Sequence, residues 1–225
     1  MLGLLQHALD WSEIWALLIP LVVLFFRRGQ PNFFRPVISY LWLALLINAV
    51  GIILWQYNIG KSLEEMISNN PLYNLHSVIR FCCFCYFFLL LKQRHFVFLK
   101  KVLPLIFVCF LCVNFFFFES FFLRDHLSGN LLSAEAFLLL VYCMLYYISQ
   151  LREEVERFRS GKAFWVVTGL AIYVVINFFV FLFYVPLITE NPDIAERMWN
   201  IHNIAYILFC IFMSKAIYVS NPVKG

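Results

Sequence analysis

Charged residues are scarce in this sequence. Asp, Glu, Lys and Arg make up 13% of its 225 residues, whereas 63% are hydrophobic and the mean hydropathy is +0.82. A soluble domain needs a far more polar surface, so this composition excludes water as the main solvent of the folded chain. The net charge of +4 does not indicate nucleic acid as a partner. We therefore expect the lipid bilayer to surround the protein.

Compact catalytic fingerprints are also missing. The sequence holds no GxSxG, HExxH, Walker or dinucleotide-binding motif, and it leaves no room for a soluble catalytic domain, so we expect no cofactor. The seven cysteines are odd in number and lie in apolar runs, which argues against a disulfide framework. No basic segment precedes the first apolar run, so we expect no cleavable signal peptide.

Long apolar runs dominate what is present. A helix of about 20 residues crosses a bilayer, and seven runs approach or reach this length. They predict an all-α, polytopic membrane protein with seven transmembrane helices in a single domain, 1–225. The runs are Ser12–Phe26, Val37–Trp55, Tyr73–Leu91, Val102–Phe118, Leu131–Leu151, Ala163–Val185 and Trp199–Tyr218.

Basic residues gather in alternate loops. Of the 17 Lys and Arg residues, 11 follow the first, third or fifth run, and Lys215 and Lys224 lie at the C-terminal end of the chain. The other loops hold only Lys61, Arg124 and Arg197, and Arg80 lies within a run. Cytoplasmic loops carry an excess of Lys and Arg. The pattern therefore predicts a multi-pass protein with an external N-terminus and a cytoplasmic C-terminus.

Arg80 lies inside the third run, with His76 four residues before it on the same helix face. An ionisable group in an apolar span costs several kcal/mol unless it meets water or a partner. Glu135 in the fifth run is the expected partner, because both side chains tilt toward the outer side. Glu119 and Glu13 are the alternatives.

Other polar side chains fall at a similar depth, in the outer third of the predicted bundle. One interpretation is a structural ion pair with satellite hydrogen bonds. The other is an outward-facing pocket for a small polar or anionic ligand that competes with Glu135 for Arg80. The expected ligand-binding residues are His76, Arg80, Glu135, Asn177, His202, Asn203 and Tyr206.

A zinc site is a further alternative, because His76, Glu135 and His202 are plausible zinc ligand types. Such a site would suit an intramembrane lipid hydrolase. Seven-helix hydrolases of the ceramidase and adiponectin-receptor superfamily carry an HxxxH pair late in the chain, but here Tyr206 follows His202 at that spacing. Arg80 would also repel a cation, so we expect no metal. A structural subunit of a larger membrane complex is the third alternative.

The segment between the fifth and sixth runs is the main charged stretch on the predicted cytoplasmic side. Its charges favour a docking surface for a cytoplasmic signalling protein, although a solvated connector has the same composition. The expected docking residues are Arg152, Glu153, Arg157 and Arg159.

Three local motifs accompany this layout: NLHSVIRF opens the third run, FWVVTGLAIY the sixth and WNIHNIAYILF the seventh. The pattern resembles bacterial seven-helix membrane sensor modules, which sit upstream of histidine kinases or other outputs, or stand alone. The resemblance implies a membrane sensor or receptor-like module of a bacterial inner membrane, and on this interpretation, unlike the hydrolase alternative, the chain is not itself an enzyme. Because the sequence stops at Gly225, the implied output is a separate protein.

Overall fold

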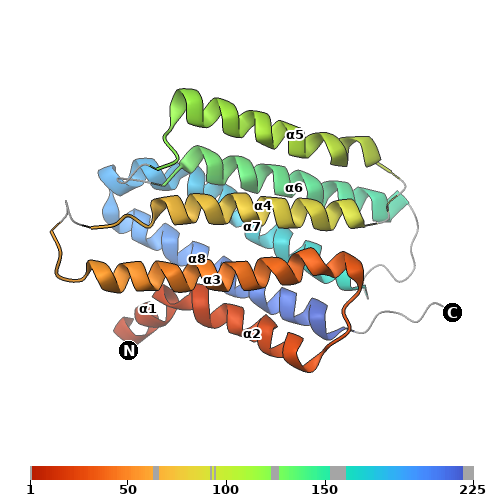
Figure 1. The fold of residues 1–225 in the computed structure, drawn as a ribbon, viewed down its shortest axis with the longest axis horizontal. Helices are drawn as coiled ribbons and strands as arrows, with labels where there is room; N and C mark the ends of the chain where they lie inside the picture. Colours follow the sequence, from red (N-terminus) through yellow and green to blue (C-terminus); the bar gives the residue numbers. More distant parts are fainter. Residues whose placement is uncertain are drawn as a thin grey trace.

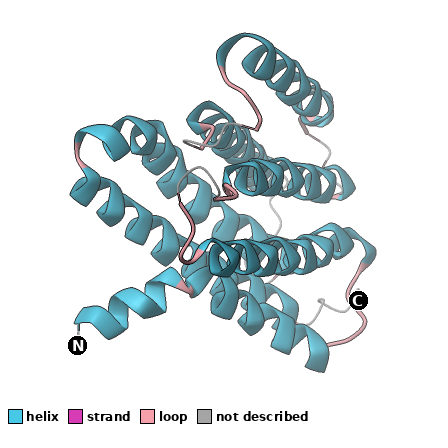
Figure 2. Ribbon diagram, turned by 60° about the vertical axis from the view of Figure 1, so that its left-hand side comes forward, coloured by secondary structure: helices cyan, strands magenta, loops and turns pink. Residues whose placement is uncertain are grey.

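The computed structural model describes residues 2–62, 66–91, 93, 95–122, 127–152 and 161–219. In these ranges every regular element is a helix, and the long helices run side by side along one axis, whereas the N-terminal helix projects from the bundle at an angle (Figures 1 and 2). The elements are α1 (Leu2–Asp10), α2 (Ser12–Phe26), η1 (Asn32–Phe34), α3 (Arg35–Asn58), α4 (Asn70–Leu90), α5 (Val97–Val113), η2 (Asn114–Phe118), α6 (Gly129–Arg152), α7 (Lys162–Glu190) and α8 (Pro192–Tyr218).

Six of the helical segments in the described ranges are long and apolar enough to cross a membrane. They correspond to the second to seventh apolar runs, so the chain is a multi-pass, all-helical membrane protein. The first run forms α2, which has 15 residues. At about 1.5 Å per residue it spans roughly 22 Å, less than the roughly 30 Å hydrocarbon core of a bilayer.

The helix ends differ from the hydropathy pattern in two places. α1 precedes α2 and is separated from it by Trp11, although the pattern predicts no helix there. The loop expected from Pro186 to Met198 is instead almost entirely helical, because α7 continues to Glu190 and α8 begins at Pro192. The Asn191 side chain accepts a hydrogen bond from the Ile194 backbone N–H and so caps α8.

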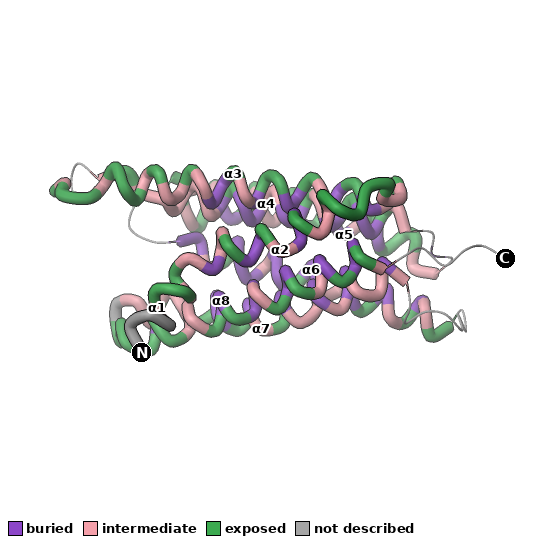
Figure 3. Tube along the Cα trace, turned by 90° about the horizontal axis from the view of Figure 1, so that it is seen from below, coloured by how far each residue is buried: buried purple, intermediate pink, exposed green. Residues whose placement is uncertain are grey.

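Six helices pack as a closed ring in the order α2, α3, α4, α6, α7, α8, and α2 completes the ring against α8. α5 lies outside this ring, against α4 and α6 (Figure 1). Buried residues follow the inward faces of the helices, and exposed residues cover the outer faces (Figure 3). The ring interior is therefore the place where buried polar groups from different helices meet.

Lys100, near the start of α5, is buried at the end of α4. Its Nζ donates to Phe88 O at 2.8 Å, to Leu91 O at 3.1 Å and to Gln93 Oε1 at 2.8 Å. The last carbonyls of a helix lack partners within it, so this ammonium group caps α4.

We expect Lys100→Met to lower the free energy of unfolding by about 1–3 kcal/mol, because buried carbonyls lose their donor. Unfolding in detergent measures the change, and Lys101→Met at the exposed neighbouring position is the control. Equal effects of the two substitutions would contradict the capping role.

Candidate functional site

Arg80 and Glu135 form a buried ion pair between α4 and α6, which are neighbours in the ring. Arg80 Nε donates to Glu135 Oε1 at 2.6 Å, and Nη2 donates to Oε2 at 2.5 Å. The two residues are 5% and 0% exposed. The partner predicted from the sequence is thus confirmed. The pair lies deeper than the outer third, because α4 begins at Asn70 and Arg80 falls midway along it.

Two hydroxyl groups complete the hydrogen bonding of this pair. Arg80 Nη1 donates to Tyr173 Oη on α7 at 2.8 Å, and Ser77 Oγ donates to Glu135 Oε2 at 2.6 Å. Both carboxylate oxygens and all three guanidinium nitrogens therefore have partners. Bidentate, charge-assisted hydrogen bonds of this kind are strong. The geometry favours a structural role in which this hydrogen-bonded pair links α4, α6 and α7.

A second polar chain joins α7, α8 and α2. Asn177 Nδ2 donates to Tyr173 O at 2.8 Å, which turns Asn177 Oδ1 toward His202 Nδ1, 2.5 Å away. Since the amide oxygen only accepts, Nδ1 of His202 carries a proton. His202 Nε2 lies 3.5 Å from Glu13 Oε1 on α2. Tyr173 is the residue common to this chain and the Arg80 pair.

A small cavity of about 20 Å³ lies where the two polar systems meet, with Glu13, His76, Arg80, His202 and Tyr206 in its lining. This is enough for about one water molecule. Within the described part of the chain, His76 Nε2 and Tyr206 Oη have no hydrogen-bond partner, although the residues are only 6% and 2% exposed. The cavity thus contains unused donors and acceptors.

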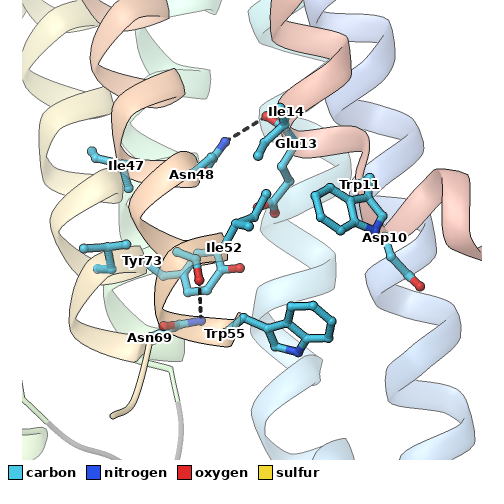
Figure 4. A pocket seen from close by; sticks show the side chains of 12 residues that line it. Asp10, Trp11, Glu13, Ile14, Ile47, Asn48, Ile52, Trp55, Asn69 and Tyr73 are labelled. Atoms are coloured by element: carbon cyan, nitrogen blue, oxygen red, sulfur yellow. Dashed lines mark hydrogen bonds between the residues drawn. The ribbon is translucent and has the colours of Figure 1, made fainter. Parts of the chain in front are cut away.

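A larger cavity of about 280 Å³ opens between α2, α3 and α4 (Figure 4). It shares Glu13, Asn48 and Tyr73 with the small cavity. Asn48 Nδ2 donates to Glu13 O at 2.8 Å, and the Tyr73 side chain interacts with the Glu13 carboxylate. The full lining is Asp10, Trp11, Glu13, Ile14, Ile47, Asn48, Gly51, Ile52, Trp55, Asn69, Leu72 and Tyr73.

The alternative partners of Arg80 have other roles. Glu13 lines both cavities, as described above. Glu119 lies at the loop before α6, where its Oε2 accepts from Asn114 Nδ2 at 2.9 Å and from Ser128 Oγ. Glu119 therefore fixes the connection between α5 and α6 and does not contact Arg80.

Most of the predicted ligand-binding residues come together in the ring interior. Four of them line the small cavity: His76, Arg80, His202 and Tyr206. Glu135 is hydrogen-bonded to Arg80, and Asn177 is hydrogen-bonded to His202. Asn203 is buried but lines neither cavity. Whether these residues bind a ligand stays a prediction.

Several residues of the site do not stand out in the sequence. Ser77 and Tyr173 are uncharged, but each lies on the helix face of a predicted residue: Ser77 three positions before Arg80, Tyr173 four before Asn177. That spacing is the signal that could have identified them. Trp11 and Trp55 carry no such signal.

The predicted docking segment is only partly described. Arg152 is exposed at the end of α6, and its guanidinium lies 5.2 Å from the Phe96 ring. Glu153, Arg157 and Arg159 lie outside the described residues. The docking surface stays a prediction.

The residues considered for zinc do not form a metal-binding cluster. Glu135 already bonds Arg80 and Ser77 through its oxygens. Among the described residues, no three His, Cys, Asp or Glu side chains are grouped so that they could hold a metal ion. Whether the chain is a lipid hydrolase stays an untested alternative.

Comparison of the chain with protein-family models, with curated proteins and with solved structures finds no match. The resemblance to seven-helix sensor modules therefore stays a prediction, and function has to be argued from the cavities and the polar groups around them.

Proposed function

We propose that the chain is a seven-span protein of a bacterial inner membrane, with its N-terminus outside and its C-terminus in the cytoplasm. The short α2 is the first span, because it packs in the ring between α3 and α8. A short span is accommodated by local thinning of the bilayer at modest cost. Basic residues support the orientation: Arg27, Arg35, Lys100, Lys162 and Lys215 lie at the end of the bundle where α8 ends (Figure 1).

The proposed function is that of a sensor or receptor-like module, which binds a small polar molecule from outside and acts on a separate cytoplasmic partner. One observation carries this proposal: the 280 Å³ cavity between α2, α3 and α4 adjoins the small cavity that contacts Arg80 and His202. Its volume is at the lower end of the range for small-molecule sites. Its lining lies at the end of the bundle that the proposed topology places outside.

The ligand acts first on Glu13, not on Arg80. The Arg80–Glu135 pair is closed by two further hydroxyl groups, whereas Glu13 keeps only a 3.5 Å contact with His202 and the interaction with Tyr73. A ligand that draws Glu13 away from His202 loosens the link between α2 and α8. It shifts the arrangement of the helices only by its differential affinity for the two states.

Gly51 on α3 provides the test of the cavity. A Cβ atom there would lie 3.7 Å from Leu72 Cδ2, which is an ordinary contact. A side chain can therefore be added at this position without a clash, and a long side chain fills the cavity. We expect small molecules from a polar-metabolite panel to raise the melting temperature of the wild type in nanodiscs, and Gly51→Leu to abolish this shift.

Ile53→Phe, which adds bulk on the exposed face of the same helix, is the matched control and should keep the shift. The same ligands should change the amide hydrogen exchange of residues 150–162, where the partner is proposed to dock. The proposal fails if no molecule stabilises the wild type, or if stabilisation survives in Gly51→Leu. Binding without any change in exchange would remove the signalling role.

A further inference from the structure

The charged groups of the larger cavity are of one sign. The residues that line it include Asp10 and Glu13 and no Lys or Arg, and the Glu13 carboxylate points into the space between the helices (Figure 4). The Glu13 side chain is 19% exposed, unlike the sealed Glu135. Apart from its 3.5 Å contact with His202, Glu13 has no basic neighbour in this lining, and a partly desolvated carboxylate of this kind attracts a cation and repels an anion.

Aromatic rings surround the same space. Trp11 at the start of α2 and Trp55 near the end of α3 border the cavity, and the Tyr73 ring lies beside Glu13 (Figure 4). Aromatic faces bind organic ammonium groups through cation–π attraction, for which Trp is the best residue. A carboxylate with two indoles and a phenol is a combination that suits a positively charged amine better than a sugar or an apolar molecule.

The small cavity behind Glu13 adds a second polar contact. His76 Nε2 and Tyr206 Oη are more than nine-tenths buried and have no partner among the described residues. The space next to them takes one group the size of water or a hydroxyl. A ligand held at Glu13 thus lies next to unused hydrogen-bonding groups, because Glu13 lines both cavities.

We propose that the ligand of this cavity is an organic ammonium ion, bound by Glu13 and by the rings of Trp11, Trp55 and Tyr73. This rests on the proposed function, in which the same cavity is the ligand site. A metal cation fits less well, since Mg²⁺ and Ca²⁺ need six or more oxygen ligands. The lining of the larger cavity offers no Lys or Arg to the carboxylate of a zwitterion.

The experiment uses two pairs of probes: choline with its neutral isostere dimethylbutanol, and phenylethylammonium with the anion phenylacetate. Binding to the full chain in nanodiscs is followed by melting temperature and by the change in tryptophan fluorescence, to which Trp11 and Trp55 contribute. We expect each cation to bind at least tenfold more tightly than its counterpart. Glu13→Gln should weaken cation binding at least tenfold, whereas Glu13→Asp, which keeps the charge, should lose less.

Glu190→Gln, at an exposed carboxylate at the end of α7, should leave binding unchanged. If Glu13→Gln does not fold, Trp55→Leu at a 56% exposed position tests the same site. The ammonium assignment is overturned if the neutral or anionic probes bind as well as the cations, if no cation binds, or if cation binding survives both substitutions. The Gly51→Leu experiment decides separately whether the cavity is a ligand site. For this purpose it uses the uncharged and anionic members of the metabolite panel, so its result does not depend on the ammonium assignment.

Discussion

Glu135→Ala is expected to lower the free energy of unfolding by about 3–5 kcal/mol, because it leaves the Arg80 guanidinium buried without its counter-charge. Arg80 is 5% exposed and midway along α4, so its side chain has no short path to water. Ser77 also loses the acceptor of its hydrogen bond. The loss should appear as a lower midpoint in detergent unfolding, and Glu190→Ala at the exposed end of α7 should change the midpoint little.

The double variant Arg80→Leu/Glu135→Leu tests whether the loss of stability comes from the unpaired charge or from any substitution at this position. Replacing a buried pair by apolar residues of similar volume is often neutral, and the freed Ser77 hydroxyl can bond to a carbonyl of its own helix. We expect the double variant to be more stable than Glu135→Ala. A double variant as unstable as the single one would mean that the charge left behind is not the cause.

The helices themselves could be predicted from the sequence because a bilayer provides no water to hydrogen-bond the backbone. A segment in lipid has to satisfy its own backbone hydrogen bonds, so each long apolar run had one possible structure. The ends of the helices were harder to predict. The polar residue Asn70 begins α4, and Pro192, which breaks a helix at interior positions, begins α8. Capping by Asn191 and the tolerance of Pro in the first turn decide these ends.

The Arg80–Glu135 pair was predictable for a similar reason: few ionisable residues share the interior, and a charge there needs a partner. The 280 Å³ cavity was not. Its walls come from three helices, α2, α3 and α4, and Gly51 contributes no side chain to fill the space between them. Gaps between helices depend on their relative placement, which hydropathy and spacing along one chain do not encode.

Gly169 on α7 is the second position where we expect a large effect. A Cβ atom built there would lie 2.4 Å from Phe212 Cβ and 3.2 Å from Phe212 Cγ on α8. The nearest atom is next to the backbone, so no rotation of the Phe212 side chain removes the clash. Small residues at membrane interfaces let helices approach closely. Gly169→Ala should cost about 1–3 kcal/mol, the usual range for overpacking, and Gly169→Leu more.

Thermal unfolding in detergent measures both Gly169 variants against Gly51→Ala, where the added Cβ meets nothing closer than 3.7 Å. The Gly51 control should stay near the wild type, so a drop confined to Gly169 reports packing and not the general effect of replacing glycine. Adding Phe212→Gly removes the opposing Cβ, and contacting sites couple by about 0.5–3 kcal/mol. The cost of Gly169→Ala should therefore be smaller in the Phe212→Gly background. Purely additive effects would show that α7 and α8 do not approach this closely in the membrane, and the His202–Asn177 contact between the same two helices would then lose its support as well.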